Sequence, residues 1–286
     1  ANLSVKFDSK EQFAGGSLAV ANHLAGFVQN VTVVAGLGKQ NSHEEFIRSK
    51  LQKNVTLEPF YFIDAPTIVK RRYVDNDLYK LFEVYFYNDH PSLENINPQV
   101  CSWLEKNTAQ FDLVIVPDFG NGFISAKMIQ KLCNNSRYLA VNTQMNSGNR
   151  GYHSINRYPR ADFVSLNGPE LRIATHNRHD PNEDLARQLL KKTGAKHFAV
   201  TLGSDGALLL EKKPDVVHKI PVLSTSSLAR ASLSTSASGP LPVRKTPSLS
   251  ESLSRLEEVA ISNPANVFPE PGTPEIKIKD FFLLIL

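Results

Sequence analysis

Residues 196–210 hold the pattern with the clearest chemical potential, a glycine-rich turn between two apolar stretches. The turn carries Thr201, Gly203, Ser204 and Gly206, and the flanking stretches, 197–201 and 207–210, predict buried strands. Two glycines three residues apart let the backbone take positive φ and approach a ligand without a Cβ in the way. Backbone N–H groups beside hydroxyls suit a phosphate or a ribose. An ordinary glycine hairpin is the alternative, and the turn alone does not separate the two.

The elements that must position this turn alternate between helix and strand along the chain. Such alternation predicts a three-layer α/β/α, doubly wound and mostly parallel sheet, with ligands at the carboxyl ends of the strands. We expect strands at 31–35, 56–63, 112–116, 138–141, 162–166, 197–201, 207–210 and 216–222, and helices from Gly15-Gly16 to Phe27 and at 44–51, 98–107, 124–133, 169–175 and 182–192.

Residues 66–87 break this alternation. They read as two strands around a polar turn near Asp75-Asn76-Asp77, which predicts a β-hairpin inserted at the edge of the α/β domain. Such an insertion suits a lid over a site or a clasp between two copies of the chain. A plain edge hairpin, whose charges prevent edge-to-edge aggregation, is the alternative.

Composition narrows the class of protein and its partners. The net charge of +4 is spread out and no basic block interleaves with aromatics, so nucleic-acid binding has little support. Two isolated cysteines, Cys101 and Cys133, favour buried thiols in a reducing compartment, which predicts a cytoplasmic protein. No apolar run reaches about 18 residues, so we expect no membrane span. The chain starts without Met or a signal peptide, and we expect a fragment of a longer protein.

The composition changes near residue 224. From there to 254 Ser, Thr, Ala and Pro dominate, and 263–274 is rich in proline. Such segments bury too little apolar surface to offset the entropy of ordering, so we predict a low-complexity, disordered tail over 224–286. The apolar residues at its end, 281–286, are too few to span a membrane and are typical of an adhesive strand.

Five motifs in one order resemble the ribokinase-like (PfkB) carbohydrate kinase family, and within it the heptose-7-phosphate kinase group. Gly15-Gly16 is similar to the family's sugar-binding glycine pair, and Pro66–Arg72 is similar to the group's P-T-I-x-K-x-R lid strand. The strand ending in Asp118-Phe-Gly-Asn-Gly resembles D-[YF]-x-x-G. Asn167-Gly-Pro-Glu170 resembles N-x-x-E, and Thr201–Gly206 resembles T-x-G-x-x-G. The resemblance covers residues 13–223.

This resemblance implies ATP-dependent phosphorylation of a sugar or sugar phosphate, in which positioning and charge neutralisation dominate. It implies that Asn167 and Glu170 organise Mg²⁺, largely through waters, and that both also serve the nucleotide side. Thr201, Gly203 and Gly206 would contact ATP. Lys70 and Arg72 would reach a phosphate of the substrate, while Gly15, Gly16 and Asp118 would line the sugar pocket.

Alternatives to these roles remain open. Asp118 could cap the following helix, and Glu170 could sit in the first turn of its own helix, stabilised by the dipole. Asn142 and Gln144 are either nucleotide-side groups or polar loop residues.

The chain also departs from the family pattern. After the strand at 216–222 the family has D-T-x-G-A-G-D, whose backbone N–H groups form an anion hole and whose last Asp is the general base. Here residues 224–232 read S-T-S-S-L-A-R-A-S, so no catalytic residue is assigned. The family's first strand is absent from the start of the chain. Ala19 and Asn121 replace an Asn and a Lys, and Glu83 and Tyr85 occupy charged positions of the heptose kinases.

We therefore divide the chain into a kinase domain at 1–223, incomplete at both ends and carrying a β lid at about 56–88, and a tail at 224–286. Three readings follow. The first is a kinase scaffold with impaired catalysis, which could form a homodimer through the lid. The second is a non-catalytic sugar- or nucleotide-binding module. The third is a non-functional truncated product, whose sheet would leave apolar faces exposed.

Overall fold

A computed structural model describes residues 5–146, 148–149, 151–222 and 280–285, and within them the chain forms one large mixed sheet and a separate hairpin. The large sheet has nine strands in the order β10-β9-β8-β7-β6-β5-β11-β1-β2. All neighbours are parallel except β8–β9 and β9–β10. The predicted α/β class with a mostly parallel sheet is confirmed. The strands are β1 (Asn30–Gly38), β2 (Val55–Phe62), β5 (Leu113–Asp118), β6 (Leu139–Thr143), β7 (Phe163–Asn167), β8 (His197–Thr201), β9 (Ala207–Glu211), β10 (Val216–Ile220) and β11 (Asp280–Ile285).

The helices begin and end where local sequence favours it. Ser125 caps α4 by accepting the Met128 N–H at 3.1 Å. The helix α6 has Glu183 and Asp184 in its first turn and Lys191 and Lys192 in its last, which complements its dipole. In the part of the chain that the structure describes, the α-helices are α1 (Ser17–Leu24), α2 (Glu44–Lys50), α3 (Ile96–Asn107), α4 (Ala126–Asn135), α5 (Gly168–Thr175) and α6 (Asn182–Thr193).

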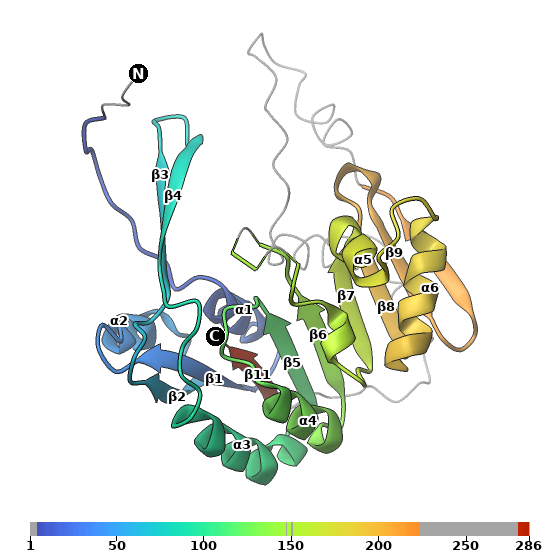
Figure 1. The fold of residues 1–286 in the computed structure, drawn as a ribbon, viewed down its shortest axis with the longest axis horizontal. Helices are drawn as coiled ribbons and strands as arrows, with labels where there is room; N and C mark the ends of the chain where they lie inside the picture. The colour runs from blue at the N-terminus through green and yellow to red at the C-terminus, as the bar shows by residue number, and fades with distance from the viewer. Residues whose placement is uncertain (1–4, 147, 150, 223–279, 286) are drawn as a thin grey trace.

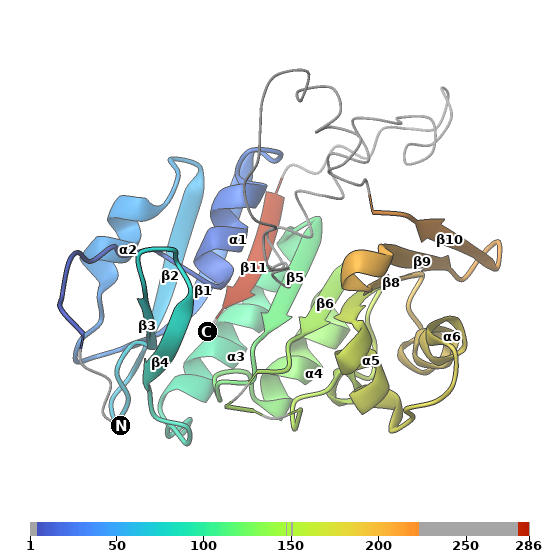
Figure 2. The same cartoon turned by 90° about the horizontal axis from the view of Figure 1, so that it is seen from above.

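Two hydrophobic clusters cover the two faces of the sheet. The larger packs α3, α4, α5 and α6 on one face, and the smaller packs α1 and α2 on the other face near β1 and β2 (Figures 1 and 2). Successive side chains of β1 enter opposite clusters: Val34 lies in the larger, whereas Val33 and Ala35 lie in the smaller. A strand buried on both faces reads as a continuous apolar run, as β1 does. Within the described residues, no helix has the length and apolar character that crossing a membrane would require.

The predicted hairpin is confirmed as β3 (Val69–Val74) and β4 (Lys80–Phe86), an antiparallel pair separate from the large sheet. It extends away from the sheet, beyond the carboxyl end of β2 (Figure 1). We call residues 69–86 the lid hairpin.

The last strand differs from the sequence prediction. We expected one disordered tail over 224–286, but Asp280–Ile285 form β11 in the interior of the sheet, parallel to both neighbours. Val33 and Ile115 both pair with Leu283, so β11 joins β1 to β5 (Figure 2). The apolar end of the chain is therefore a structural strand rather than a free one. The rest of the predicted tail, 223–279, lies outside the described residues.

Candidate functional site

The start of α1 and the turn after β5 lie together. Gly16 is the N-cap of α1 with φ 57°, and a Cβ added to it would stand 3.8 Å from the Phe119 ring. A Cβ added to Gly15 would meet nothing within 4 Å, so the helix start faces open space. The structure thus places the predicted glycine pair beside the turn that follows Asp118.

Asp118 is a buried brace at the end of β5. Its carboxylate is 2% exposed and accepts three hydrogen bonds, from Gly120 N–H at 3.0 Å and from Arg157 Nη1 and Tyr158 Oη at 2.9 Å each. Burial and the neighbouring Asp118 raise the pKa of Tyr158 well above its usual value, so the phenol stays a donor. The alternative that Asp118 caps the next helix is wrong, because Ser125 caps it. The role of Asp118 in a sugar pocket stays a prediction.

The loop after β6 packs on the same turn. Asn146 Nδ2 and Asn149 Nδ2 donate to the Phe119 carbonyl at 2.7 and 2.9 Å. The buried Nδ1 of His153 has no hydrogen-bond partner among the described residues, and burial and Arg157 lower the pKa of this imidazole. Sequence reasoning selected Asn142 and Gln144 at the start of this loop, but neither its later asparagines nor the Arg157–Tyr158 pair. The density of Asn and Gly over 142–151 is a usable indication of a constrained loop.

Asn167 and Glu170 form a reciprocal capping box at the start of α5. Asn167 Oδ1 accepts the Glu170 N–H at 2.8 Å, and Glu170 Oε2 accepts the Asn167 N–H at 2.9 Å. Glu170 Oε1 also accepts the Met145 N–H at 3.0 Å, which ties α5 to the loop after β6. Burial raises the pKa of Glu170 despite these hydrogen bonds. The predicted first-turn position of Glu170 is confirmed.

These contacts limit how a metal ion could bind. The described residues contain no group of three or more His, Cys, Asp or Glu side chains arranged to hold one. Both Glu170 oxygens and Asn167 Oδ1 already accept backbone hydrogen bonds, so the pair fits a water-mediated contact better than direct coordination. Asn142 likewise has a local partner, since its Nδ2 donates to the Ser165 carbonyl at 2.8 Å.

The glycine turn joins β8 to the antiparallel β9, and its two glycines have different surroundings. Gly203 has φ 61° and an added Cβ would meet nothing within 4 Å. Gly206 has φ 87°, and an added Cβ would stand 2.0 Å from the Ile220 carbonyl oxygen. Gly206 therefore serves close packing against β10, whereas Gly203 is open to a ligand. Beside the turn is an open cleft of about 500 Å³, lined by Leu202, Asp205, Ala207, Leu208, Lys219, Ile220 and Pro221.

Lys70 and Arg72 of the lid hairpin lie on the same face of it. Arg72 Nε lies 2.6 Å from Glu83 Oε1, and the Lys70 ammonium lies 5.0 Å from the centre of the Tyr85 ring. Burial and the nearby Arg72 lower the pKa of Lys70. No contact within the described residues joins either cation to Gly16 or Asp118. The structure therefore groups Lys70 with Arg72 but does not bring them against the sugar-side residues.

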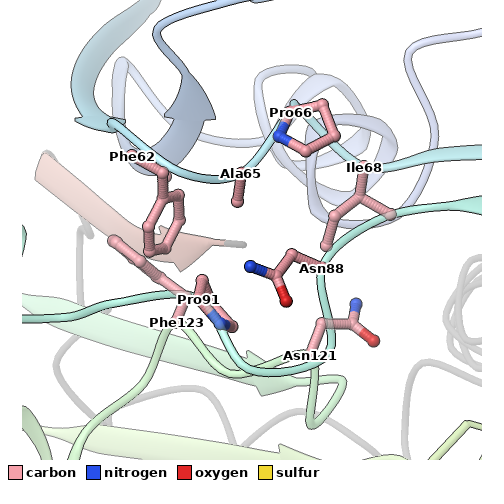
Figure 3. Close-up of a pocket in the computed structure, with 9 residues that line it drawn as sticks. Phe62, Ala65, Pro66, Ile68, Asn88, Pro91, Asn121 and Phe123 are labelled. Atoms are coloured by element: carbon pink, nitrogen blue, oxygen red, sulfur yellow. The ribbon is translucent and has the colours of Figure 1, made fainter.

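A small cavity lies where the lid hairpin meets the body (Figure 3). Its volume is about 10 Å³, room for about one water. Figure 3 shows the Asn88 and Asn121 amides at this cavity, beside the rings of Phe62 and Phe123. The cavity is too small for a sugar, so it marks the junction of the lid and not a substrate pocket.

The large sheet is doubly wound, with polar groups gathered at its carboxyl edge, where sheets of this kind bind ligands. Residues 2–226 match the model of the pfkB family of carbohydrate kinases, and the chain belongs to this family. No protein of curated function matches the sequence.

Solved structures agree on the fold. Phosphofructokinase-2 from Escherichia coli, in complex with potassium, is similar with a TM-score of 0.60 at 14% identity, over 88% of this chain and 75% of that one. Ribokinase from Thermotoga maritima is similar with a TM-score of 0.52 at 15% identity, over 82% of this chain and 69% of that one. Ribokinase from Giardia lamblia is similar with a TM-score of 0.52 at 15% identity, over 77% of this chain and 71% of that one.

Proposed function

We propose that this chain is a sugar-kinase scaffold that binds Mg-ATP and a sugar or sugar phosphate, and that transfers phosphate slowly in this form. The observation that carries the proposal is the register of the sheet. Asn167 and Thr201 are paired at the carboxyl ends of the parallel strands β7 and β8. Two motifs 34 residues apart in sequence thus form one polar edge beside the open cleft at Leu202 and Asp205.

On this proposal the nucleotide phosphates lie over the Gly203 turn. The N–H groups of Leu202, Asp205 and Gly206 donate to carbonyls within the turn, which leaves those of Gly203 and Ser204 and the Thr201 hydroxyl as donors to the phosphates. The open surroundings of Gly203 leave room for a ligand. Glu170 and Asn167 would hold waters of Mg²⁺, which when bound neutralises charge on the transferring phosphoryl group. The sugar would lie between Gly15-Gly16 and the turn after Asp118, and Asp118 would hold that turn in shape.

Impaired transfer follows from the sequence at residues 224–232, which lie outside the described residues. A missing general base lowers the rate about 10²–10⁴-fold. Missing anion-hole donors lower it about 10²–10³-fold more. The heptose-7-phosphate likeness rests on Pro66–Arg72 and makes a sugar phosphate one of two substrate classes to test.

The second candidate function is a non-catalytic binding module. It is favoured by Asp118 and Glu170, whose carboxylates bind loops of the protein itself. The third reading, a product that never packs, is disfavoured by two buried clusters and a sheet continuous through β11.

The experiment is a pair of measurements on one preparation. Calorimetry would measure binding of Mg-ATP and of a panel of hexoses, heptoses and their phosphates, and a coupled assay would measure ADP release. Binding of both ligand classes with slow, sugar-dependent ADP release supports the proposal. Binding without ADP release selects the binding module, and no binding of either class rejects both.

We also propose that two copies associate through the lid hairpin. Tyr73 and Phe82 stack at 4.5 Å between ring centres, and Phe82 and Phe86 are 42% and 44% exposed. Exposed aromatics on a projecting hairpin suit a second copy of the same ribbon. Sedimentation should show a dimer that Phe86→Ser weakens at least tenfold. A monomer at all concentrations would contradict this.

A further inference from the structure

The lid hairpin has two chemically different faces. Arg72 pairs with Glu83 and Lys70 with Tyr85, which places these four side chains on one face. On the other face Tyr73 pairs with Phe82, and the Arg71 guanidinium lies 5.0 Å from the centre of the Phe86 ring. The first face, which we call the charged face, therefore carries Lys70, Arg72 and Glu83, whereas the other is largely apolar, with Arg71 over an aromatic ring. This division follows the alternation of side chains along a β-ribbon.

The charged face continues toward the body of the protein. The Tyr85 and Tyr87 rings lie edge to face at 6.2 Å, and a Cβ added to Gly148 would stand 3.2 Å from the Tyr87 hydroxyl. Gly148 belongs to the loop after β6, which is bonded to the turn after Asp118 through Asn146 and Asn149. The charged face thus borders the loops at the carboxyl edge of the sheet.

Glu83 lies at the centre of this face, and its carboxylate accepts hydrogen bonds from the donors around it. Oε1 lies 2.6 Å from Arg72 Nε and 3.3 Å from Lys80 Nζ, and Oε2 accepts from the Tyr85 hydroxyl at 2.9 Å. The Glu83 side chain is only 15% exposed, although Arg72 is 66% exposed. These donors are of the kind that binds a phosphate, and here an internal carboxylate already accepts them.

We propose that Glu83 is a specificity-determining residue that binds Arg72 in place of a substrate anion, so that the lid selects an unphosphorylated sugar over a sugar phosphate. The inference rests on the proposed function for the sugar, but the contacts of Glu83 are independent of it. A phosphate would have to displace Glu83 from Arg72 or place two further negative charges beside the carboxylate. The first route leaves the Glu83 charge unpaired, and the second brings like charges together. Both disfavour phosphorylated substrates through charge rather than through shape.

The first test uses inorganic phosphate as the probe and the full chain as the protein. The Nε–H resonance of Arg72, assigned by its loss in Arg72→Gln, would be followed during phosphate titration of the unmodified chain and of Glu83→Gln. The glutamine keeps an acceptor for Arg72 but removes the charge. We expect the variant to bind phosphate at Arg72 at least tenfold more tightly, the scale of one charge-assisted hydrogen bond. Asp77→Asn removes an equal charge from the tip of the lid and should change this affinity less than twofold.

The second test compares fructose with fructose 6-phosphate by calorimetry. We expect the unmodified chain to prefer fructose, and Glu83→Gln to shift the ratio of the two affinities at least tenfold toward the phosphate. Adding Arg72→Gln to the variant should cancel that shift. Equal phosphate response at Arg72 in both proteins, or a tighter complex of the unmodified chain with fructose 6-phosphate, overturns the role of Glu83. If neither fructose nor fructose 6-phosphate binds, the Arg72 titration alone decides on Glu83, and the ligand panel described above decides on the proposed function.

Discussion

Single residues in this protein mostly hold loops in place at the edge of a sheet. Asp118 accepts hydrogen bonds from three donors in two segments of the chain, and Glu170 joins α5 to the loop after β6. Side chains that sequence patterns assign to ligand contact are thus also structural. A substitution at such a position should therefore lower the stability of the fold as well as any ligand affinity, so stability has to be measured first.

Asp118→Asn should cost about 3–5 kcal/mol of unfolding free energy, because it leaves the Arg157 charge without its buried partner. Urea unfolding measures this. Glu105→Gln is the control: Glu105 is 61% exposed in its 2.9 Å pair with Lys131, so we expect a loss below about 1 kcal/mol. Equal losses of unfolding free energy in the two variants would show that the buried contacts of Asp118 do not stabilise the fold.

The two glycines of the Thr201–Gly206 turn should respond differently to alanine. Gly206→Ala should cost about 3 kcal/mol or more, since the new methyl would overlap the Ile220 carbonyl at positive φ. Gly203→Ala should cost about 1–2 kcal/mol for positive φ alone. Thermal unfolding compares them, and a larger loss at Gly203 would contradict the packing described for Gly206.

At the scale of elements, the lid hairpin depends on one carboxylate. Burial alone would raise the pKa of Glu83, but hydrogen bonds from Arg72, Tyr85 and Lys80 outweigh it and hold the pKa at about 2. A lowered pKa in the folded state means that this stabilisation is complete above the ordinary carboxyl pKa and is lost as the pH falls toward 2. We expect the ¹³C carboxyl resonance of Glu83, identified by its loss in Glu83→Gln, to titrate near pH 2. A midpoint at the ordinary value of 4.5 would show that the ion pairs do not form in solution.

The central element is β11, which joins β1 to β5. Leu283→Pro removes a backbone donor from the interior of the sheet and should abolish cooperative unfolding. Lys219→Pro, in the edge strand β10, should leave a cooperative transition at lower temperature. Circular dichroism on heating measures both. An unchanged melt of Leu283→Pro would mean that the sheet does not need β11.

At the scale of the molecule, sequence periodicity predicted the elements from α1 to β10 and the inserted hairpin. It succeeded because each element carries its own pattern, such as the apolar run of β1 or the charged ends of α6. It indicated a strand-forming segment at 281–286 but could not predict its place in the sheet, since a short apolar segment does not indicate which strands it will join. Nor could it predict the Asp118–Arg157 pair, whose members are 39 residues apart and meet only in the folded chain.

The most direct test of the central claim is thermal unfolding of the full chain with and without saturating Mg-ATP. Ligand at 100 times its Kd adds about 2.7 kcal/mol to the folded state, which should raise the midpoint by about 5–10 °C. Mg²⁺ alone should have a smaller effect, because the described residues contain no cluster of three ligands for a metal ion. A cooperative melt that rises with Mg-ATP is the predicted result. A cooperative melt that Mg-ATP leaves unchanged would contradict a nucleotide site in this kinase scaffold.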